Sequence, residues 1–329
     1  MRVGIDVAPL VQTQAGTARW VNGLLDALRR RDDIEPVPLG WGGAGRWTAV
    51  ARDVLWYPAL LPRQARRQGL DLVHCTIYRG PLRSRVPAVV TVHDLAVLRQ
   101  PEAFPAWTRL YARTWLGPTL RAARRLVAVS EFSRRETVAL AGVPEERIDV
   151  VPNAVDALFT EDGPAAEGDY LLAVGTLEPR KNLARAAEAA RLAGLELRVV
   201  GARGWGGVEA GGDGALWLGR VPDEELAALY RGARCLVYPS LYEGFGIPVA
   251  EAMACGCPVV TSRSSAMADV AGDAAVLVDP LDPAAIAAGI DEAAARRIEL
   301  VARGLERAAA LTWERAAAAA VEAYRKALA

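Results

Sequence analysis

Two glutamates, Glu243 and Glu251, are separated by seven residues in a segment that also holds Gly244, Phe245 and Gly246. A carboxylate can accept two hydrogen bonds from hydroxyls on adjacent carbons, so a pair of this kind suits a sugar and a ribose. The other interpretation needs no ligand: Glu251 would offset the dipole at the start of a helix, and Glu243 would be a solvated loop charge. The two glutamates alone do not decide between these interpretations.

The residues after Glu243 predict a short helix. Pro248 suits the first helical position, where a missing N–H has no partner to lose, and Gly256 suits the left-handed position just past a helix end. We therefore expect a helix over residues 248–255, with Glu251 about one turn inside it. Backbone N–H groups at its N-terminus and the helix dipole would favour a negatively charged ligand.

A second segment carries two cations. Gly175 follows a strand-like run and permits a turn, and Arg180 and Lys181 stand just before the next expected helix. Two cations beside a helix N-terminus could clamp a diphosphate. An Arg-Lys pair at such a place is commonly surface charge alone, but its combination with the two glutamates is more specific.

Both segments belong to a chain of 329 residues that alternates β-branched runs with helical stretches. Strand followed by helix, repeated, implies a parallel sheet covered on both faces. A polar stretch ending at Asp169 separates two such series, so we expect the α/β class, with two Rossmann-like doubly wound domains over 1–155 and 156–310. In the last segment, 311–329, a helix over Trp313–Leu328 could fold back on the first domain.

The expected strands divide between the two domains. Those of the first are Arg2–Val7, Leu70–His74, Ala88–Val92, Leu126–Val129 and Ile148–Val151. Those of the second are Tyr170–Val174, Leu195–Val200, Ala215–Leu218, Cys235–Tyr238, Pro258–Thr261 and Ala274–Val278.

Composition limits the compartment and the partners. The chain start lacks the zones of a signal peptide, and no apolar run approaches the roughly 18 residues that cross a bilayer. We therefore expect a cytoplasmic protein, with any membrane contact peripheral at the inner face. Net charge is zero, but residues 1–155 hold 22 Arg against 14 Asp and Glu, so the first domain could favour an anionic surface. No nucleic-acid partner is expected. Two histidines and a Cys-Gly-Cys without zinc-site spacing predict no metal.

Several motifs together resemble glycosyltransferase family 4, of the GT-B fold, and within it the mannosyltransferase-like branch. The motifs are Gly175-Thr-Leu-Glu-Pro-Arg-Lys-Asn182, Glu243-Gly-Phe-Gly-Ile-Pro-Val-Ala-Glu251, Val151-Pro-Asn-Ala-Val-Asp156, Val129-Ser-Glu-Phe-Ser133 and Val270-Ala-Gly-Asp-Ala274. The resemblance covers nearly the whole chain. It implies two Rossmann-like domains facing a cleft, with a nucleotide-sugar held mainly by the second and an acceptor by the first. It also implies retention of anomeric configuration without a metal or other cofactor.

The resemblance also implies roles for single residues. Arg180 and Lys181 would neutralise the departing nucleoside diphosphate. Glu243 would hold the donor sugar together with the Phe245 and Gly246 amides, and Glu251 would hold the ribose. The family has Gly-Arg where this chain has Gly175-Thr, so Arg180 could take over that role. The other residues expected at the donor are Gly16, Gly175, Val221, Gly244 and Ile247.

Two sites in the first domain complete the prediction. His93 follows the strand expected over 88–92, at the edge where open α/β sheets bind ligands. A single histidine is more often structural, but the match to a family histidine implies a contact with the donor sugar. Gly16 lies in the loop 14–19, which could approach the diphosphate or acceptor, or be a bare turn. In the second domain, Val221 would lie near the base.

One aromatic segment permits two interpretations. Trp107, Leu110, Tyr111 and Trp115 recur at helical spacing and are interleaved with arginines. Such a segment could lie on a membrane surface, or it could pack into a core. Gly117-Pro118 is expected to interrupt the helix.

The sequence thus predicts a retaining, metal-independent glycosyltransferase that moves a hexose, with mannose favoured, from GDP-mannose or a UDP-hexose. The acceptor would be a glycan, a lipid-linked molecule or a small molecule. One alternative is a sugar-nucleotide epimerase or hydrolase on the same fold, and another is a non-catalytic nucleotide-sugar-binding protein. A dehydrogenase is disfavoured because no G-x-G-x-x-G follows the first strand.

Overall fold

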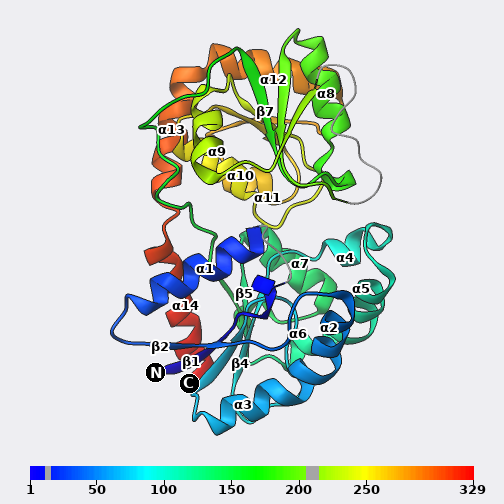
Figure 1. Cartoon of the computed structure of the whole chain (residues 1–329), viewed down its shortest axis with the longest axis vertical. Helices are drawn as coiled ribbons and strands as arrows, with labels where there is room; N and C mark the ends of the chain where they lie inside the picture. The colour runs from blue at the N-terminus through cyan, green and yellow to red at the C-terminus, as the bar shows by residue number, and fades with distance from the viewer. Residues whose placement is uncertain (12–15, 205–214) are drawn as a thin grey trace. The chain divides into compact units, whose positions relative to one another are not determined.

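The computed structural model describes residues 1–11, 16–204 and 215–329. The chain divides into two compact units, the first formed by Met1–Ala154 with Trp313–Ala329 and the second by Val155–Thr312. Each unit is built on one six-stranded sheet surrounded by helices, and the described strand pairs are all parallel (Figure 1). The predicted α/β class with two doubly wound domains is confirmed.

The first sheet has the order β2-β1-β3-β4-β5-β6. Its strands are β1 (Arg2–Asp6), β2 (Glu35–Leu39), β3 (Leu72–Cys75), β4 (Ala88–Val92), β5 (Arg125–Ala128) and β6 (Ile148–Val150). Only β2 was not predicted. Glu35 N–H donates to Met1 O, so the backbone nitrogens of the alternate residues Pro36 and Pro38 point away from β1. Proline has no N–H to donate, which a strand tolerates when that side is the sheet edge.

The helical segments of the first unit come from most of its length. They are η1 (Ala8–Val11), α1 (Gly16–Arg29), α2 (Arg46–Ala51), η2 (Arg52–Leu60), α3 (Leu61–Arg67), α4 (Ala96–Arg99), η3 (Pro101–Ala103), α5 (Ala106–Tyr111), η4 (Ala112–Leu116), α6 (Gly117–Ala122), α7 (Glu131–Ala141), η5 (Glu145–Arg147) and α14 (Trp313–Leu328). The interruption expected at Gly117-Pro118 is wrong, because α5, η4 and α6 follow one another without a gap. Pro118 stands in the first turn of α6, after a π-helical segment, where its missing N–H removes little.

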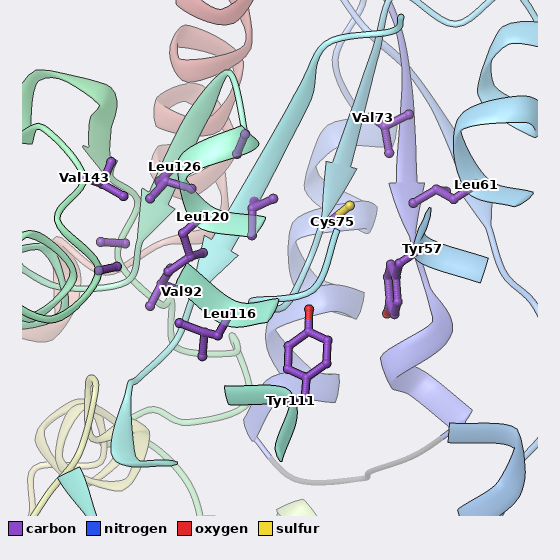
Figure 2. Packing of buried hydrophobic residues seen from close by; sticks show 14 of the residues in the cluster. Tyr57, Leu61, Val73, Cys75, Val92, Tyr111, Leu116, Leu120, Leu126 and Val143 are labelled. Carbon is purple, nitrogen blue, oxygen red and sulfur yellow. The ribbon is translucent and has the colours of Figure 1, made fainter. Parts of the chain in front are cut away.

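An apolar core fills the space between the first sheet and its helices (Figure 2). Strand residues Val73, Val92 and Leu126 and the helical residues Leu61 and Leu116 are each at most 2% exposed. Burying each of these aliphatic side chains contributes about 1.5–3 kcal/mol to folding. The core therefore fixes the positions of the strand ends from which the loops begin.

The aromatic segment packs mainly inward. Tyr111 belongs to the core, and the ring of Trp115 lies 5.9 Å from both Tyr111 and Trp107. The indole Nε1 of Trp107 donates to Asp53 Oδ2 at 2.8 Å, while Leu110 is half exposed. In the described ranges, every helix is too short or too polar to span a bilayer.

The last helix, α14, packs on the first sheet and has the bounds expected from the sequence (Figure 1). Trp313, Val321 and Tyr324 are buried in it. The Tyr324 hydroxyl lies 2.7 Å from Nδ1 of His74, a fully buried residue of β3. The chain crosses between units after Ala154 and again after residue 312.

The second sheet has the order β12-β11-β10-β7-β8-β9. Its strands are β7 (Tyr170–Val174), β8 (Glu196–Val200), β9 (Ala215–Gly219), β10 (Leu236–Tyr238), β11 (Val259–Ser262) and β12 (Val276–Val278). Its helical segments are η6 (Pro179–Lys181), α8 (Leu183–Leu192), α9 (Asp223–Gly232), α10 (Ile247–Ala254), α11 (Ala266–Ala271), α12 (Pro283–Ala295) and α13 (Arg297–Ala309). Strand order reverses between β7 and β10, and open α/β sheets bind ligands at the carboxyl ends of strands at such a point.

Candidate functional site

Three predicted site residues meet at this switch point in the second unit. Arg180 and Lys181 lie in η6, after β7, and Glu243 lies in the loop after β10. Lys181 Nζ donates to Glu243 Oε1 at 2.6 Å, and Arg180 Nη1 donates to Glu243 Oε2 at 2.8 Å. One carboxylate therefore bridges both cations, although about 60 residues of chain separate them from it.

Side chains at the end of β10 complete this arrangement. Lys181 Nζ also donates to the Tyr238 hydroxyl at 2.6 Å, and that hydroxyl lies 3.1 Å from Glu243 Oε1. Ser240 Oγ donates to the same carboxylate oxygen at 2.7 Å. Lys181 and Glu243 are thus fixed by neutral hydroxyls as well as by each other.

A second carboxylate, Glu178, orients the arginine. Arg180 Nε donates to Glu178 Oε2 at 3.0 Å and Arg180 Nη2 donates to Oε1 at 3.1 Å, a bidentate pair. The side chain of Glu178 is 4% exposed and that of Arg180 is 18% exposed. Two cations and two carboxylates, including Glu243, therefore balance in charge at this place.

Electrostatics keep Glu243 ionised. Burial alone would raise the pKa of this carboxyl, but the neighbouring Arg180 and Lys181 lower it to about 2. For Lys181, burial lowers the pKa of the ammonium and the attraction of Glu243 opposes that shift. We name Glu178, Arg180, Lys181 and Glu243 the charge cluster.

Two glycines let the loops behind the charge cluster come together. Gly175 N–H donates to Val200 O at 2.8 Å, and a Cβ on Gly201 would lie 1.9 Å from the carbonyl oxygen of Gly175. A Cβ on Gly175 would meet the Lys181 side chain at 3.1 Å. A side chain at position 201 would therefore push away the Gly175 backbone, and one at position 175 would crowd the Lys181 side chain.

The predicted helix after Glu243 is α10, which begins at Ile247, one residue earlier than expected. Pro248 stands in its first turn, and Gly256 has the predicted left-handed φ of 66° just past its end. Gly246 precedes the helix with φ 94°, a conformation that glycine adopts without strain. The backbone from Gly244 to Ile247 therefore lies at the N-terminus of α10, as predicted.

The structure gives Glu251 a separate partner. Glu251 lies in α10, is 2% exposed, and accepts a hydrogen bond at 3.0 Å from the hydroxyl of Tyr230 in α9. Its role at the ribose stays a prediction. Val221 follows β9, at the carboxyl edge of the same sheet, and its role at the base stays a prediction too.

In the first unit, His93 follows β4 as predicted. Its Nε2 lies 2.9 Å from Thr76 O, and because a carbonyl only accepts, Nε2 must carry the hydrogen. Burial lowers the pKa of His93, which favours the neutral ring, so Nδ1 is a hydrogen-bond acceptor. The ring stands edge-on to Trp20, with centroids 5.0 Å apart.

Gly16 is the exposed first residue of α1. Gln14 and Ala15, which belong to the loop proposed to approach the diphosphate or acceptor, lie outside the described residues. The contribution of this loop therefore stays a prediction.

Known families match both units. Residues 18–157 match the model of Glycosyltransferase Family 4, and residues 156–309 match that of Glycosyl transferases group 1. O-antigen chain mannosyltransferase B from Escherichia coli is 37% identical over 287 residues, covering 76% of this chain and 74% of that protein. The chain belongs to the family 4 glycosyltransferases.

Other proteins share parts of this likeness. The glycosyltransferase is 31% identical to MMP alpha-(1->4)-mannosyltransferase from Mycolicibacterium hassiacum over 80% of its length and 72% of that protein. Sucrose-phosphate synthase from Thermosynechococcus elongatus has a TM-score of 0.76 at 18% identity, covering 99% of this chain and 98% of that one. Anabaena HepE in complex with UDP-glucose has a TM-score of 0.73 at 17% identity, covering 99% of each chain. These structures show the shared GT-B fold.

Sequence reasoning about the glycosyltransferase missed three members of its site. Glu178 stands in the same motif as Arg180. Tyr238 ends the buried strand β10 and Ser240 follows it, a few residues before Glu243. Polar residues directly after a buried strand were the available signal, because strand ends meet at one sheet edge.

Proposed function

We propose that this glycosyltransferase transfers mannose from GDP-mannose, with retention of configuration and without a metal. The meeting of Arg180 and Lys181 on Glu243 carries the proposal. Two fixed cations can offset the charge that develops on a departing diphosphate, as a bound divalent ion does elsewhere. Mannose as the sugar is supported by the names of the relatives from E. coli and M. hassiacum, both mannosyltransferases.

In the proposed reaction, the bond between the anomeric carbon and the diphosphate oxygen breaks and a bond to the acceptor oxygen forms on the same face. The acceptor proton leaves with the diphosphate. Arg180 and Lys181 stabilise the leaving group. Glu243 binds the hydroxyls of the donor sugar together with the amides of Phe245 and Gly246. The ribose contact of Glu251 and the base contact of Val221 belong to the same proposal.

The first unit would supply the acceptor site. His93 presents Nδ1 as an acceptor for a hydroxyl of the donor sugar, and Gly16 would approach the diphosphate. A glycan acceptor is supported by the O-antigen relative. We further propose that the enzyme acts in the cytoplasm and contacts the membrane peripherally through the arginine-rich first unit.

The proposal is tested by incubating purified protein with GDP-mannose or UDP-glucose and a panel of mannose-ended oligosaccharides, with and without EDTA. We expect turnover of GDP-mannose that EDTA leaves unchanged, and a product whose anomeric NMR signal matches the donor configuration. Loss of turnover in EDTA with recovery in Mg²⁺ would refute the metal-free mechanism, and an inverted product would refute retention.

The same assay separates the alternatives. Free mannose formed as fast without acceptor as with it would indicate a hydrolase. Binding of GDP-mannose in calorimetry, without turnover on any acceptor, would indicate a non-catalytic binding protein. Faster turnover of UDP-glucose would overturn the choice of donor.

A further inference from the structure

Asn182, the residue after Lys181, has an uncommon backbone conformation. It joins η6 to α8 with φ 58° and ψ 34°, in the left-handed region that few residues other than glycine adopt. Its carbonyl accepts from the N–H groups of Arg185 and Ala186 and so begins α8. Asparagine is among the residues that tolerate this region best, and here it is also 5% exposed.

The polar atoms of the Asn182 side chain are fully used. Nδ2 donates to the carbonyl oxygens of Pro239, at 3.0 Å, and Pro280, at 2.6 Å. Because both partners are carbonyls, the nitrogen of the amide must face them. Oδ1 accepts from Arg185 Nη1 at 2.9 Å.

These hydrogen bonds tie three loops at one sheet edge. Asn182 follows β7, Pro239 follows β10 and Pro280 follows β12. Near the same point, Leu241 N–H donates to Arg180 O at 2.8 Å. The backbone that carries Arg180 and Lys181 is thus fastened to the backbone that leads into Glu243.

We infer that Asn182 is a positioning residue for transfer, holding the β7 loop against the β10 and β12 loops so that both cations meet the leaving diphosphate. The inference rests on the proposed function. The side chain of Asn182 bonds to Pro239 O, Pro280 O and Arg185. It acts through the loops, and a displacement of about 1 Å at a charged catalytic group can cost on the order of 100-fold in rate.

Asn182→Gly separates the two properties of this residue. Glycine keeps the left-handed backbone but removes both bonds to the Pro239 and Pro280 carbonyls. We expect kcat for mannose transfer from GDP-mannose to fall roughly 10- to 100-fold, with the protein still folded by circular dichroism. An unchanged kcat in folded Asn182→Gly would overturn the inference while the wild type keeps its activity. A wild type that turns over no donor would instead refute the proposed function.

Asn182→Asp supplies a second variant of nearly equal size that also tolerates the backbone conformation. Its carboxylate has no donor for the two carbonyls, so we expect a larger loss of kcat than in Asn182→Gly. Equal activity of Asn182→Asp and wild type would contradict the inference, whether or not the glycine variant folds.

A structural effect is distinguished by a matched control and a double-mutant cycle. Tyr170→Phe removes another buried hydrogen bond to a carbonyl, from the Tyr170 hydroxyl to Leu229 O at 2.8 Å, at the opposite end of β7. We expect that variant to lose stability and keep kcat.

In a Lys181→Met background, Asn182→Gly should lower kcat much less than in wild type, because the group that Asn182 positions is absent. Losses that multiply would show that Asn182 does not act through Lys181.

Discussion

The two units hold their candidate groups in different ways. In the second unit, the charge cluster consists of ionised groups that neutralise one another at distances of 2.6 to 3.1 Å. In the first unit, both histidines have a lowered pKa because they are buried, and each is held by a neutral partner. His93 is bound to Thr76 O, and His74 lies between the hydroxyls of Tyr324 and Thr91.

This difference explains which part of the function can be inferred. Two cations fixed at a switch point define a class of ligand, since they suit an anion such as a diphosphate. A neutral histidine that offers one acceptor nitrogen suits almost any hydroxyl. The second unit therefore supports the proposed class of donor, while the first unit leaves the acceptor open.

Removing the shared carboxylate should have the largest effect. In Glu243→Gln, Lys181 loses its ionised partner and Arg180 keeps only Glu178, so a diphosphate no longer competes with Glu243 for the two cations. We expect transfer to fall by about 100-fold or more, while GDP binds more tightly than to wild type. Steady-state kinetics measure the first quantity and calorimetry with GDP measures the second.

Glu188→Gln is the control for this variant, because Glu188 pairs with Arg191 on the exposed surface of the same unit. It should leave both quantities unchanged. If GDP binds more weakly to Glu243→Gln than to wild type, the carboxylate does not compete with the diphosphate. If transfer is unaffected, Glu243 is outside the site.

Acid should lower the stability of the first unit more than that of the second, an effect of intermediate size. Burial lowers the pKa of His74 to about 3, so below pH 6.5 the unfolded chain takes up a proton that the folded chain refuses. The first unit should lose stability as pH falls from about 6.5 toward 3, by up to roughly 1.4 kcal/mol per pH unit. Glu243, with a pKa of about 2, stays ionised in the folded second unit over that range and destabilises it only below its usual pKa of 4.5.

The variant His74→Gln isolates this effect. Asp6 acts in the opposite direction, because burial raises its pKa to about 6, but it is present in both proteins and cancels in the comparison. Hydrogen exchange of β3 peptides between pH 6.5 and 4.5 should show a smaller loss of stability in the variant. Equal slopes would show that His74 is not the proton-sensitive group.

The smallest effect is expected at Tyr324→Phe. This change removes the hydroxyl 2.7 Å from His74 Nδ1 and leaves a buried nitrogen without its partner. We expect the free energy of unfolding of the first unit to fall by about 1–2 kcal/mol, seen as a lower urea midpoint. GDP affinity should stay unchanged, and an altered affinity would mean that α14 influences the donor site.

Much of the fold could be predicted because parallel strands carry a local signal. Short apolar runs marked every described strand but β2, whose prolines hide an edge strand. Pro248 and Gly256 located α10 to within one residue. The continuity of the helix through Pro118 could not be predicted, because a π-helical segment before the proline has no sequence signal that we recognised.

The candidate site was predictable only in part. Arg180, Lys181 and Glu243 stand in recognisable motifs, but their meeting, and the contact of Lys181 with Tyr238, depends on β10 lying beside β7. That neighbour relation is a property of sheet order, not of spacing. The spacing of Glu251 likewise fixed its place one turn into α10 and did not foretell its hydrogen bond with Tyr230 in the preceding helix.

The position of α14 has a consequence for how the protein is made. Residues 155–312 are an insertion within the first unit, whose chain ends with the helix that closes over its sheet. A ribosome therefore completes the second unit while the first still lacks Trp313, Val321 and Tyr324, and His74 has no hydroxyl on one side. The second unit can therefore be complete before the first, whose sheet receives α14 only after residue 312 has been synthesised.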